Sequence, residues 1–308
     1  MAKISGLDAA MESVPPWEGV PDSEQEQRVR GASPLEMLQR LLRNRSACAG
    51  GLIVVLTVAC TVLGPIVDSV DPTNINPIMH LQPIGSAGHP LGTDLLGRDM
   101  LARLLDGGRL SLFAGVVSAL ISTVLGVLLG MVAGFAGALL DNLIMRLLDI
   151  LLGFPFILLA ILIVAFAGPS TVNAMIAIAI ASIPFFARIT RGLVMSLKAR
   201  EFVTAAYALG AGHTRVLFVH ILLNLWPAIV ATLFLNIGFM ITQTSALSFL
   251  GLGTQPPTPD WGTMLADSES YMGISTAIAS LPGITIVVSV IGFNLLGNGL
   301  RDLVNGAV

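Results

Sequence analysis

Apolar positions along the chain form long runs without charged residues, separated by short polar segments. A helix needs about 20 apolar residues to cross a bilayer. The run at 150–187 is too long for one span and is interrupted at Gly168 and Pro169. The pattern therefore predicts an all-α polytopic membrane protein, whose six spans lie at about 48–67, 111–134, 147–167, 172–188, 226–249 and 277–297.

The composition supports a membrane protein. Of the 308 residues, 54% are hydrophobic and 11% are charged, whereas soluble domains carry about 25% charged residues. The net charge of -3 argues against a nucleic-acid partner. The two cysteines, Cys48 and Cys60, are too few for a disulfide framework, so we expect free thiols at or in the bilayer.

The segment before the first span divides into two parts. Residues 1–33 are polar and lack the apolar core of a signal peptide, which predicts a disordered tail. Residues 34–46 begin with a capping box of Ser33 and Glu36, and leucines recur on one helical face with arginines beside them. This segment is predicted to be an amphipathic interfacial helix.

Lysine and arginine residues predict the orientation, because cytoplasmic loops carry an excess of positive charge. Thirteen of the 16 lie in the N-terminal segment, around 146, between 188 and 215, or at Arg301. The opposite side has only Arg98, Arg103 and Arg109. Both termini are therefore expected in the cytoplasm of a multi-pass protein of the cell membrane.

Residues 198–224 are polar compared with the two apolar runs around them. Charges at Lys198, Arg200, Glu201 and Arg215 exclude a seventh span, since each costs about 2.5–3.5 kcal/mol at a helix centre. Helical periodicity interrupted at Gly210 predicts two short cytoplasmic helices joined by a glycine turn.

Small residues recur every fourth position in the second span, at Ser118, Ser122, Gly126, Gly130 and Gly134. Such a ridge lets another helix approach closely within lipid, so we predict a packing role.

Uncharged polar residues in the last two spans include Asn236, Gln243 and Asn294. Such groups either form hydrogen bonds between helices or line a polar pathway, and both roles remain open from the sequence.

The segment after the first span pairs Asp94 with Arg98 and Asp99 with Arg103 at a spacing of four. With the acid first, this spacing is favourable on a helix. It predicts an amphipathic helix on the outer membrane face; a docking surface for a delivering receptor is the functional alternative.

The chain carries no P-loop, because neither Lys3 nor Lys198 follows the required glycine pattern. A membrane enzyme is disfavoured because all four histidines fall outside the spans, and His213 and His220 make a weak metal pair. A secondary transporter is the other alternative. It usually needs ionisable groups at the bilayer midplane, and no predicted span has one in its middle.

Four motifs resemble one family, and the resemblance runs from about residue 35 to the end. EFVTAAYALGAGHTRVLFVHIL (201–222) is similar to the EAA loop of ABC importer permeases. LGTDLLGRD (91–99), LSFLGLGTQPPTPDWGTML (247–265) and FNLLGNGLRD (293–302) resemble the other signatures of peptide permeases. The combination points to the C-type subunit of dipeptide and oligopeptide importers.

This resemblance implies the type I ABC importer permease fold and a non-catalytic subunit that forms half of a peptide pathway. It implies a B-type permease, two ATPase subunits or one fused ATPase, and an extracytoplasmic substrate-binding protein as partners. ATP and Mg would be bound by the ATPases, with no cofactor in this chain. The implied ATPase contacts are Glu201, Thr204, Ala205, Ala206, Gly210 and Arg215.

The chain departs from the family pattern at three positions. Thr204 stands where the EAA loop usually has an acid, Leu223 where proline is common, and Asn298 where aspartate is common. The resemblance does not fix the substrate, since related permeases carry dipeptides, longer peptides, glutathione, nickel complexes or haem.

Overall fold

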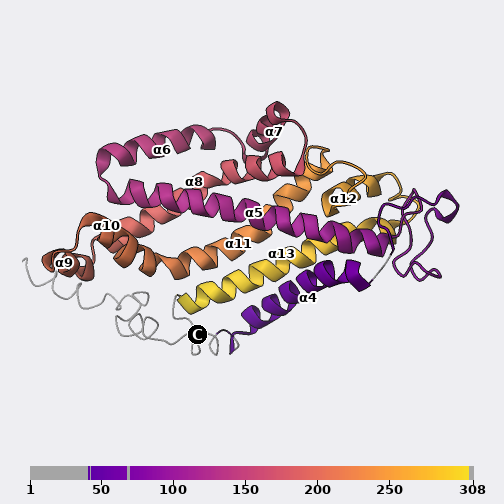
Figure 1. Ribbon diagram of the computed structural model, residues 1–308, viewed down its shortest axis with the longest axis horizontal. Helices are drawn as coiled ribbons and strands as arrows, with labels where there is room; N and C mark the ends of the chain where they lie inside the picture. The colour runs from indigo at the N-terminus through magenta and orange to yellow at the C-terminus, as the bar shows by residue number, and fades with distance from the viewer. Residues whose placement is uncertain (1–40, 42, 68–69, 305–308) are drawn as a thin grey trace, which may run out of the picture.

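The computed structural model describes residues 41, 43–67 and 70–304. The tail predicted at 1–33 lies outside this part of the chain, as does most of the interfacial helix predicted at 34–46. Within the described residues the protein is built from helices without any named strand (Figure 1).

Five long helices form the body of the molecule: α4 (Arg45–Val67), α5 (Met100–Phe135), α8 (Thr171–Lys198), α11 (Leu222–Phe249) and α13 (Thr276–Val304). Shorter elements connect them: η1 (Pro77–Met79), α6 (Ala138–Leu152), α7 (Phe156–Ala167), α9 (Glu201–Ala208), α10 (His213–Arg215), the π-helical turn η2 (Val216–Ile221) and α12 (Trp261–Glu269). Each long helix, with α10 and η2 counted as the start of α11, is long and apolar enough to cross a membrane.

The span predicted at 147–167 is not one straight helix. It is divided between α6 and α7, which meet at an angle of 86° and together count as a sixth candidate span. Gly153 ends α6 and Pro155 precedes α7. Proline has no N–H to donate and disfavours a helical conformation at the residue before it, which explains a break at this point.

The outer-face helix predicted around Asp94, Arg98 and Asp99 is absent, and this prediction was wrong. Residues 91–99 form turns, and Asp99 is the N-cap of α5, where it accepts a bond from the Ala102 amide. Gly92 and Gly97 have φ angles of 77° and 71°. Glycine adopts this left-handed region readily, so the chain turns where a continuous helix was expected.

The ridge of small residues on α5 packs against α8, as predicted. A Cβ atom added at Gly126 would lie 2.4 Å from the Phe186 Cβ, and one at Gly130 would lie 2.4 Å from the Ala187 carbonyl oxygen. The Ser118 hydroxyl donates to the Met175 carbonyl at 3.1 Å. Close backbone approach of this kind stabilises helix pairs in lipid through van der Waals contact.

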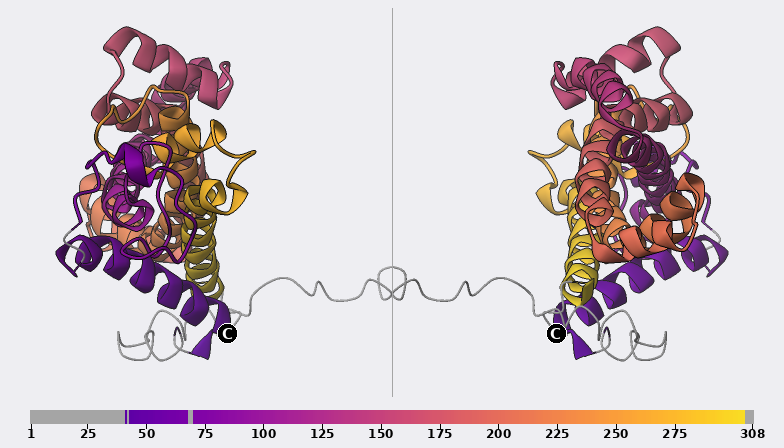
Figure 2. Two further views of the ribbon diagram at one scale, coloured as in Figure 1. Left: turned by 90° about the vertical axis from the view of Figure 1, so that its right-hand side faces the viewer. Right: turned by 90° about the vertical axis from the view of Figure 1, so that its left-hand side faces the viewer.

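The remaining helices pack on both sides of this pair. The backbone of α4 approaches α13 at Gly50 and Gly299, and Gly297 of α13 packs against Leu235 of α11. α6 and α7 lie along one edge of the bundle and α4 along the opposite edge (Figure 2). Along the long axis of the molecule, α9 lies at one end, and α12 with residues 70–99 lies at the other, which we call the cap end (Figure 1).

Candidate functional site

The α9 end of the molecule carries most of the residues predicted to contact an ATPase. α9 follows α8 after a two-residue break, and Val203 and Ala206 face the bundle while Glu201, Thr204 and Ala205 are exposed. Ala205 and Ala206 were both implied as ATPase contacts. The structure separates them, because Ala206 is only 7% exposed and packs in an apolar cluster.

A tight turn ends α9. The Gly210 amide donates to the Tyr207 carbonyl at 2.9 Å, and the Ala211 amide donates to the Ala206 carbonyl at 3.0 Å. This pair of bonds is a Schellman motif, which needs a left-handed residue after the helix. Gly210 supplies it with a φ of 84°, and its neighbour Leu209 is 89% exposed.

The second short helix predicted in this region does not exist as a separate element. From His213 the chain continues through α10 and η2 into α11 without a break, so the helix runs from 213 to 249. One apolar face continues along this helix, where Val216, Ile221 and Leu225 are all buried. The η2 segment within this helix is π-helical, and the Leu222 amide donates to the Leu217 carbonyl.

One apolar cluster joins this end of the molecule to the bundle. Its buried members come from α5, α8, α9, η2 and α11, namely Val127, Met131, Val194, Leu197, Val203, Ala206, Val216, Leu217, Ile221, Leu225 and Ile229. Lys198 adds a bond to the Phe135 carbonyl at 2.9 Å, and Arg215 is exposed. This apolar cluster therefore supports the exposed face of α9, and it includes residues of the long helix that runs from 213 to 249.

A cavity of about 750 Å³ lies among the α6–α7 bend, α8, α11 and the last turn of α13. Its lining is mostly apolar, with Phe156 and Phe239 in edge-to-face contact at 5.2 Å. Asn236 lines it and is 6% exposed, and its Nδ2 atom is buried without a hydrogen-bond partner.

The other polar residues predicted in the spans lie elsewhere. Asn294 packs against α11, since its Oδ1 atom is 3.1 Å from where a Cβ of Gly238 would be. Gln243 is half-buried on α11, two turns beyond Asn236. Neither residue lines the cavity, so the structure does not bring the three side chains into one site.

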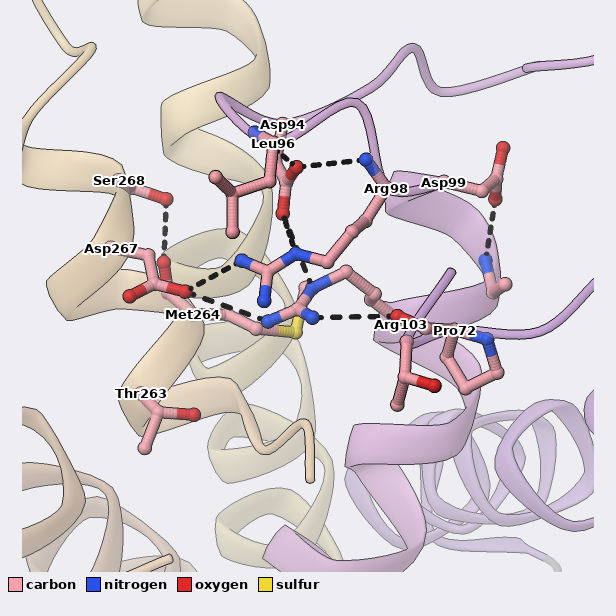
Figure 3. Close-up of polar contacts among 12 residues, drawn as sticks. Pro72, Asp94, Leu96, Arg98, Asp99, Arg103, Thr263, Met264, Asp267 and Ser268 are labelled. Carbon is pink, nitrogen blue, oxygen red and sulfur yellow. Dashed lines mark hydrogen bonds and ion pairs between the residues drawn. The ribbon is translucent and has the colours of Figure 1, made fainter. Parts of the chain in front are cut away.

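The cap end holds a cluster of charged side chains in which Asp94 and Arg103 are buried and Asp267 is exposed (Figure 3). Arg98 Nε lies 2.6 Å from Asp94 Oδ2, and its Nη2 atom lies 3.0 Å from Asp267 Oδ2. Arg103 lies between the same two carboxylates, at 3.6 Å and 3.5 Å. We call Asp94, Arg98, Arg103 and Asp267 the cap cluster.

The predicted pair of Asp99 and Arg103 is not formed by their side chains. Asp99 Oδ2 instead lies 2.7 Å from His89 Nδ1, and its Oδ1 accepts from the Ala102 amide. Because Asp99 is the N-cap of α5, its carboxylate is directed at the helix end rather than along the helix surface. The Asp94–Arg98 pair does form, but within a turn.

The sequence analysis missed α12, which completes the cap end. Asp260 caps this helix in a capping box with Thr263, a pattern visible in the sequence. Trp261 is fully buried and donates its Nε1 proton to the Leu104 carbonyl at 2.9 Å, which fixes α12 to α5. Tyr271 follows α12, and burial raises the pKa of its hydroxyl, which bonds to Ser268 at 3.0 Å.

Among the described residues, no group of three or more histidine, cysteine, aspartate or glutamate side chains is placed to hold an ion.

Two family descriptions match the chain. "Binding-protein-dependent transport system inner membrane component" matches residues 126–308. "N-terminal TM domain of oligopeptide transport permease C" matches residues 33–83.

Relatives match over most of the chain. The di/tripeptide transport system permease protein DppC of Pseudomonas aeruginosa is 45% identical over 277 residues, covering 88% of this chain and 91% of that protein. The glutathione transport system permease protein GsiD of Pectobacterium atrosepticum is 42% identical over 267 residues, covering 87% and 89%.

The fold also matches a solved structure, an inward-facing conformation of the MetNI methionine ABC transporter. The TM-score is 0.56 at 17% identity, over 66% of this chain and 97% of that one. The chain therefore belongs to the family of binding-protein-dependent transport system inner membrane components, the permease subunits of ABC importers.

Proposed function

We propose that this subunit forms half of the membrane pathway of an ABC importer for dipeptides or short oligopeptides. A related B-type permease would form the other half, and an extracytoplasmic binding protein would deliver the peptide. The names of the relatives support this substrate class, since they are permeases for di/tripeptides, dipeptides and glutathione. The subunit itself is non-catalytic, and ATP and Mg are bound by ATPase partners.

The observation that carries the coupling role is the construction of the α9 end. Glu201, Thr204 and Ala205 present an exposed helix face, while Val203 and Ala206 fix the same helix to the bundle. A rigid, exposed helix without bulky side chains suits a groove on another protein. We therefore assign Glu201, Thr204, Ala205, Gly210 and Arg215 to the ATPase contact, with Ala206 as a supporting residue beneath it.

The continuity of residues 213–249 suggests how movement is transmitted. A displacement of α9 on ATPase closure acts on the apolar cluster it shares with η2 and α11. Because α11 also lines the cavity, the same displacement would open or close the pathway by rigid-body movement of helices. This mechanism places both termini and α9 in the cytoplasm, in agreement with the distribution of positive charge.

The experiment uses the complete importer in liposomes and compares three tryptophan variants. Ala205→Trp adds bulk to the exposed face and should abolish peptide uptake while the permease remains folded. Ala138→Trp is the matched control, because Ala138 is also exposed but begins α6 outside the coupling segment. Ala206→Trp should instead lower the yield of folded permease, since that residue is buried.

The proposal also requires ATP as the energy source. Uptake by the wild type should stop when ATP is withdrawn and persist when an uncoupler removes the ion gradients. Uptake that depends on the gradients and not on ATP would identify a secondary transporter. Normal uptake by Ala205→Trp would remove α9 from the coupling mechanism.

A further inference from the structure

The lining of the cavity contains one charged side chain, and that side chain lies where the cavity reaches the surface. Arg301 and Val304, in the last turn of α13, line the cavity, and Arg301 is exposed. The rest of the lining is uncharged. Among the described residues, Arg301 forms no ion pair. We call the opening at Arg301 and Val304 the cavity mouth.

Two arginines of the neighbouring helix α8 already have acidic partners. Arg188 Nη2 lies 2.6 Å from Asp149 Oδ1, and Arg191 Nη2 lies 2.6 Å from Asp141 Oδ2. Both pairs join α8 to α6 and stand outside the cavity lining. Arg301 has no such carboxylate, although arginine forms strong charge-assisted bonds with carboxylates. The cavity mouth therefore suits a group that carries an acid next to an apolar side chain.

The N-terminal segment of the chain joins the bundle beside the cavity mouth. Residues 1–40 lie outside the described residues, but the start of α4 is described. Asn44 Nδ2 donates to Asp302 Oδ2 at 3.4 Å, and the start of α4 lies beside the end of α13 (Figure 1). Because Asp302 directly follows Arg301, the N-terminal segment is attached within a few residues of the cavity mouth.

Part of this segment has the charge that the cavity mouth lacks. Residues 8–26, DAAMESVPPWEGVPDSEQE, contain six acidic residues and no lysine, arginine or histidine. We call them the acidic segment. Its one aromatic residue, Trp17, is followed directly by Glu18. An aromatic ring next to a carboxylate matches an apolar lining that ends at a guanidinium.

The chain between the acidic segment and α4 is long enough for this contact. Residues 27–40 lie between them, and an extended chain spans up to about 3.3–3.6 Å per residue. Even with 34–40 helical at 1.5 Å per residue, as the capping box predicts, this connection reaches roughly 30 Å. Attachment in the same chain also raises the effective concentration of the segment, to the order of millimolar for short connections.

We propose that the acidic segment docks at the cavity mouth, with Glu18 paired to Arg301 and Trp17 in the cavity, and that it hinders passage through the cavity. The chain thus carries its own inhibitory segment. The effect on transport rests on the proposed import function. The docking itself rests on the charge of the mouth, the composition of residues 8–26 and their point of attachment, all on the same side of the bundle.

The lining near the cavity mouth offers a site for an indole ring. Ile189 and Leu193 of α8 are half-buried there. The Thr232 hydroxyl donates to the Ala228 carbonyl at 2.8 Å, so its oxygen keeps lone pairs and accepts the Trp17 indole N–H. A tryptophan N–H usually finds such an acceptor when the ring is buried.

The helix register places Thr232 and Arg301 at the same level of the bundle. α11 and α13 are antiparallel, since Gly238 packs against Asn294 and Gly297 packs against Leu235. Thr232 is about one turn before Leu235, and Arg301 is about one turn after Gly297. One indole with its neighbouring carboxylate can therefore meet both side chains.

The first test is a double-mutant cycle on the assembled importer with its binding protein in liposomes. The measured quantity is ATP-driven uptake of alanyl-phenylalanine. Replacing the six acids of residues 8–26 by asparagine and glutamine should raise the uptake rate by about threefold to tenfold. The same replacement in an Arg301→Gln background should add nothing, because the partner is already lost.

Matched variants separate docking from a general effect of charge. Glu36→Gln removes an acid outside the acidic segment, and Arg146→Gln removes an exposed arginine of α6 outside the lining. Both should leave uptake unchanged. Trp17→Ala should raise uptake by about threefold to tenfold, and Trp17→Phe should retain part of the inhibition. Equal uptake by all variants with changes in residues 8–26 and by the wild type would overturn the proposal.

The second test detects docking without transport. In an importer with Cys48 and Cys60 replaced by serine, Gly19→Cys is combined with Val304→Cys. A disulfide should form between them, and its yield should fall when the six acids are replaced. Gly19→Cys combined with Ala138→Cys, exposed on α6, should give none. Absence of the disulfide at Val304, or equal yields at Val304 and Ala138, would overturn the proposal.

Failure of docking and failure of the import function give different results. If the wild type takes up no dipeptide with ATP, the proposed import is wrong, and the disulfide still decides whether the segment docks. If the wild type transports, Arg301→Gln lowers uptake and the acidic segment has no influence in either background, the imported peptide or a partner subunit occupies the cavity mouth. That result would leave the import function standing and overturn the docking of residues 8–26.

Discussion

The two ends of the molecule are stabilised by different forces. At the cap end, Asp94 and Arg103 are each about 3% exposed or less and form part of a cluster of ion pairs. At the α9 end, the interior is apolar and the charged residues Glu201 and Arg215 face outward. Buried ion pairs demand a fixed geometry, whereas an apolar base tolerates small displacements.

This difference fits the coupling role proposed for the α9 end. The cap end links residues 91–99, α5 and α12 through bonds that are lost if any one of them shifts. At the α9 end, Glu201 and Arg215 are exposed on the surface. A permease that transmits movement from one side needs a rigid reference on the other, and the predictions below test whether the two ends differ in this way.

The largest effect is expected from breaking the cap cluster. Arg103→Leu leaves the Asp94 carboxylate buried with one guanidinium fewer, and loss of one partner from a buried pair costs about 3–5 kcal/mol. The permease should accumulate poorly or melt at a much lower temperature in detergent. Arg215→Leu is the control at the α9 end, where an exposed substitution should change stability by less than about 0.5 kcal/mol.

Equal losses of stability in these two variants would contradict the comparison, since it assigns the buried ion pairs to the cap end.

The next effect contrasts two adjacent alanines. Ala206→Leu forces extra volume into the apolar cluster and should cost about 1–3 kcal/mol, measured as a lower melting temperature. Ala205→Leu places the same volume on the exposed face and should leave the melting temperature unchanged. If both variants melted like the wild type, α9 would not be packed as described.

The smallest effect concerns the turn after α9. Gly210→Ala places a Cβ at a φ of 84°, which costs roughly 1–2 kcal/mol for a residue other than glycine. The same change at Gly212 should cost much less, because its φ of -72° is open to any residue. Hydrogen exchange of the amides of residues 205–211 would detect this difference locally, and equal protection in both variants would contradict it.

Local patterns in the sequence were sufficient to predict some of these structural features. The ridge from Ser118 to Gly134 predicted close helix packing because residues four apart share one helix face, and α8 is the partner. Gly210 predicted the turn after α9 because it needs only local backbone freedom. In both cases the pattern that supports the prediction lies within one helix or one turn, although the partner of the ridge, α8, is distant in the sequence.

Features that depend on distant residues were missed. Asp94, Arg98 and Asp99 have helical spacing, but Gly92 and Gly97 turn the chain before a helix can form. Arg103 pairs with Asp267, which belongs to α12 and lies far away in the sequence. The free Nδ2 of Asn236 could not be foreseen either, because its environment is made by helices that fold onto it.

The most direct test of the account asks whether α9 contacts an ATPase and moves with it. Cys48 and Cys60 are replaced by serine, and a single cysteine is placed at Ala205, opposite a cysteine in the surface groove of the ATPase. We predict a disulfide crosslink that forms in the assembled importer and changes in yield between the ATP-bound and nucleotide-free states. A cysteine at Ala138, exposed on α6, should give none. No crosslink from Ala205 in any nucleotide state, in an importer that still transports peptide, would contradict the coupling role of α9.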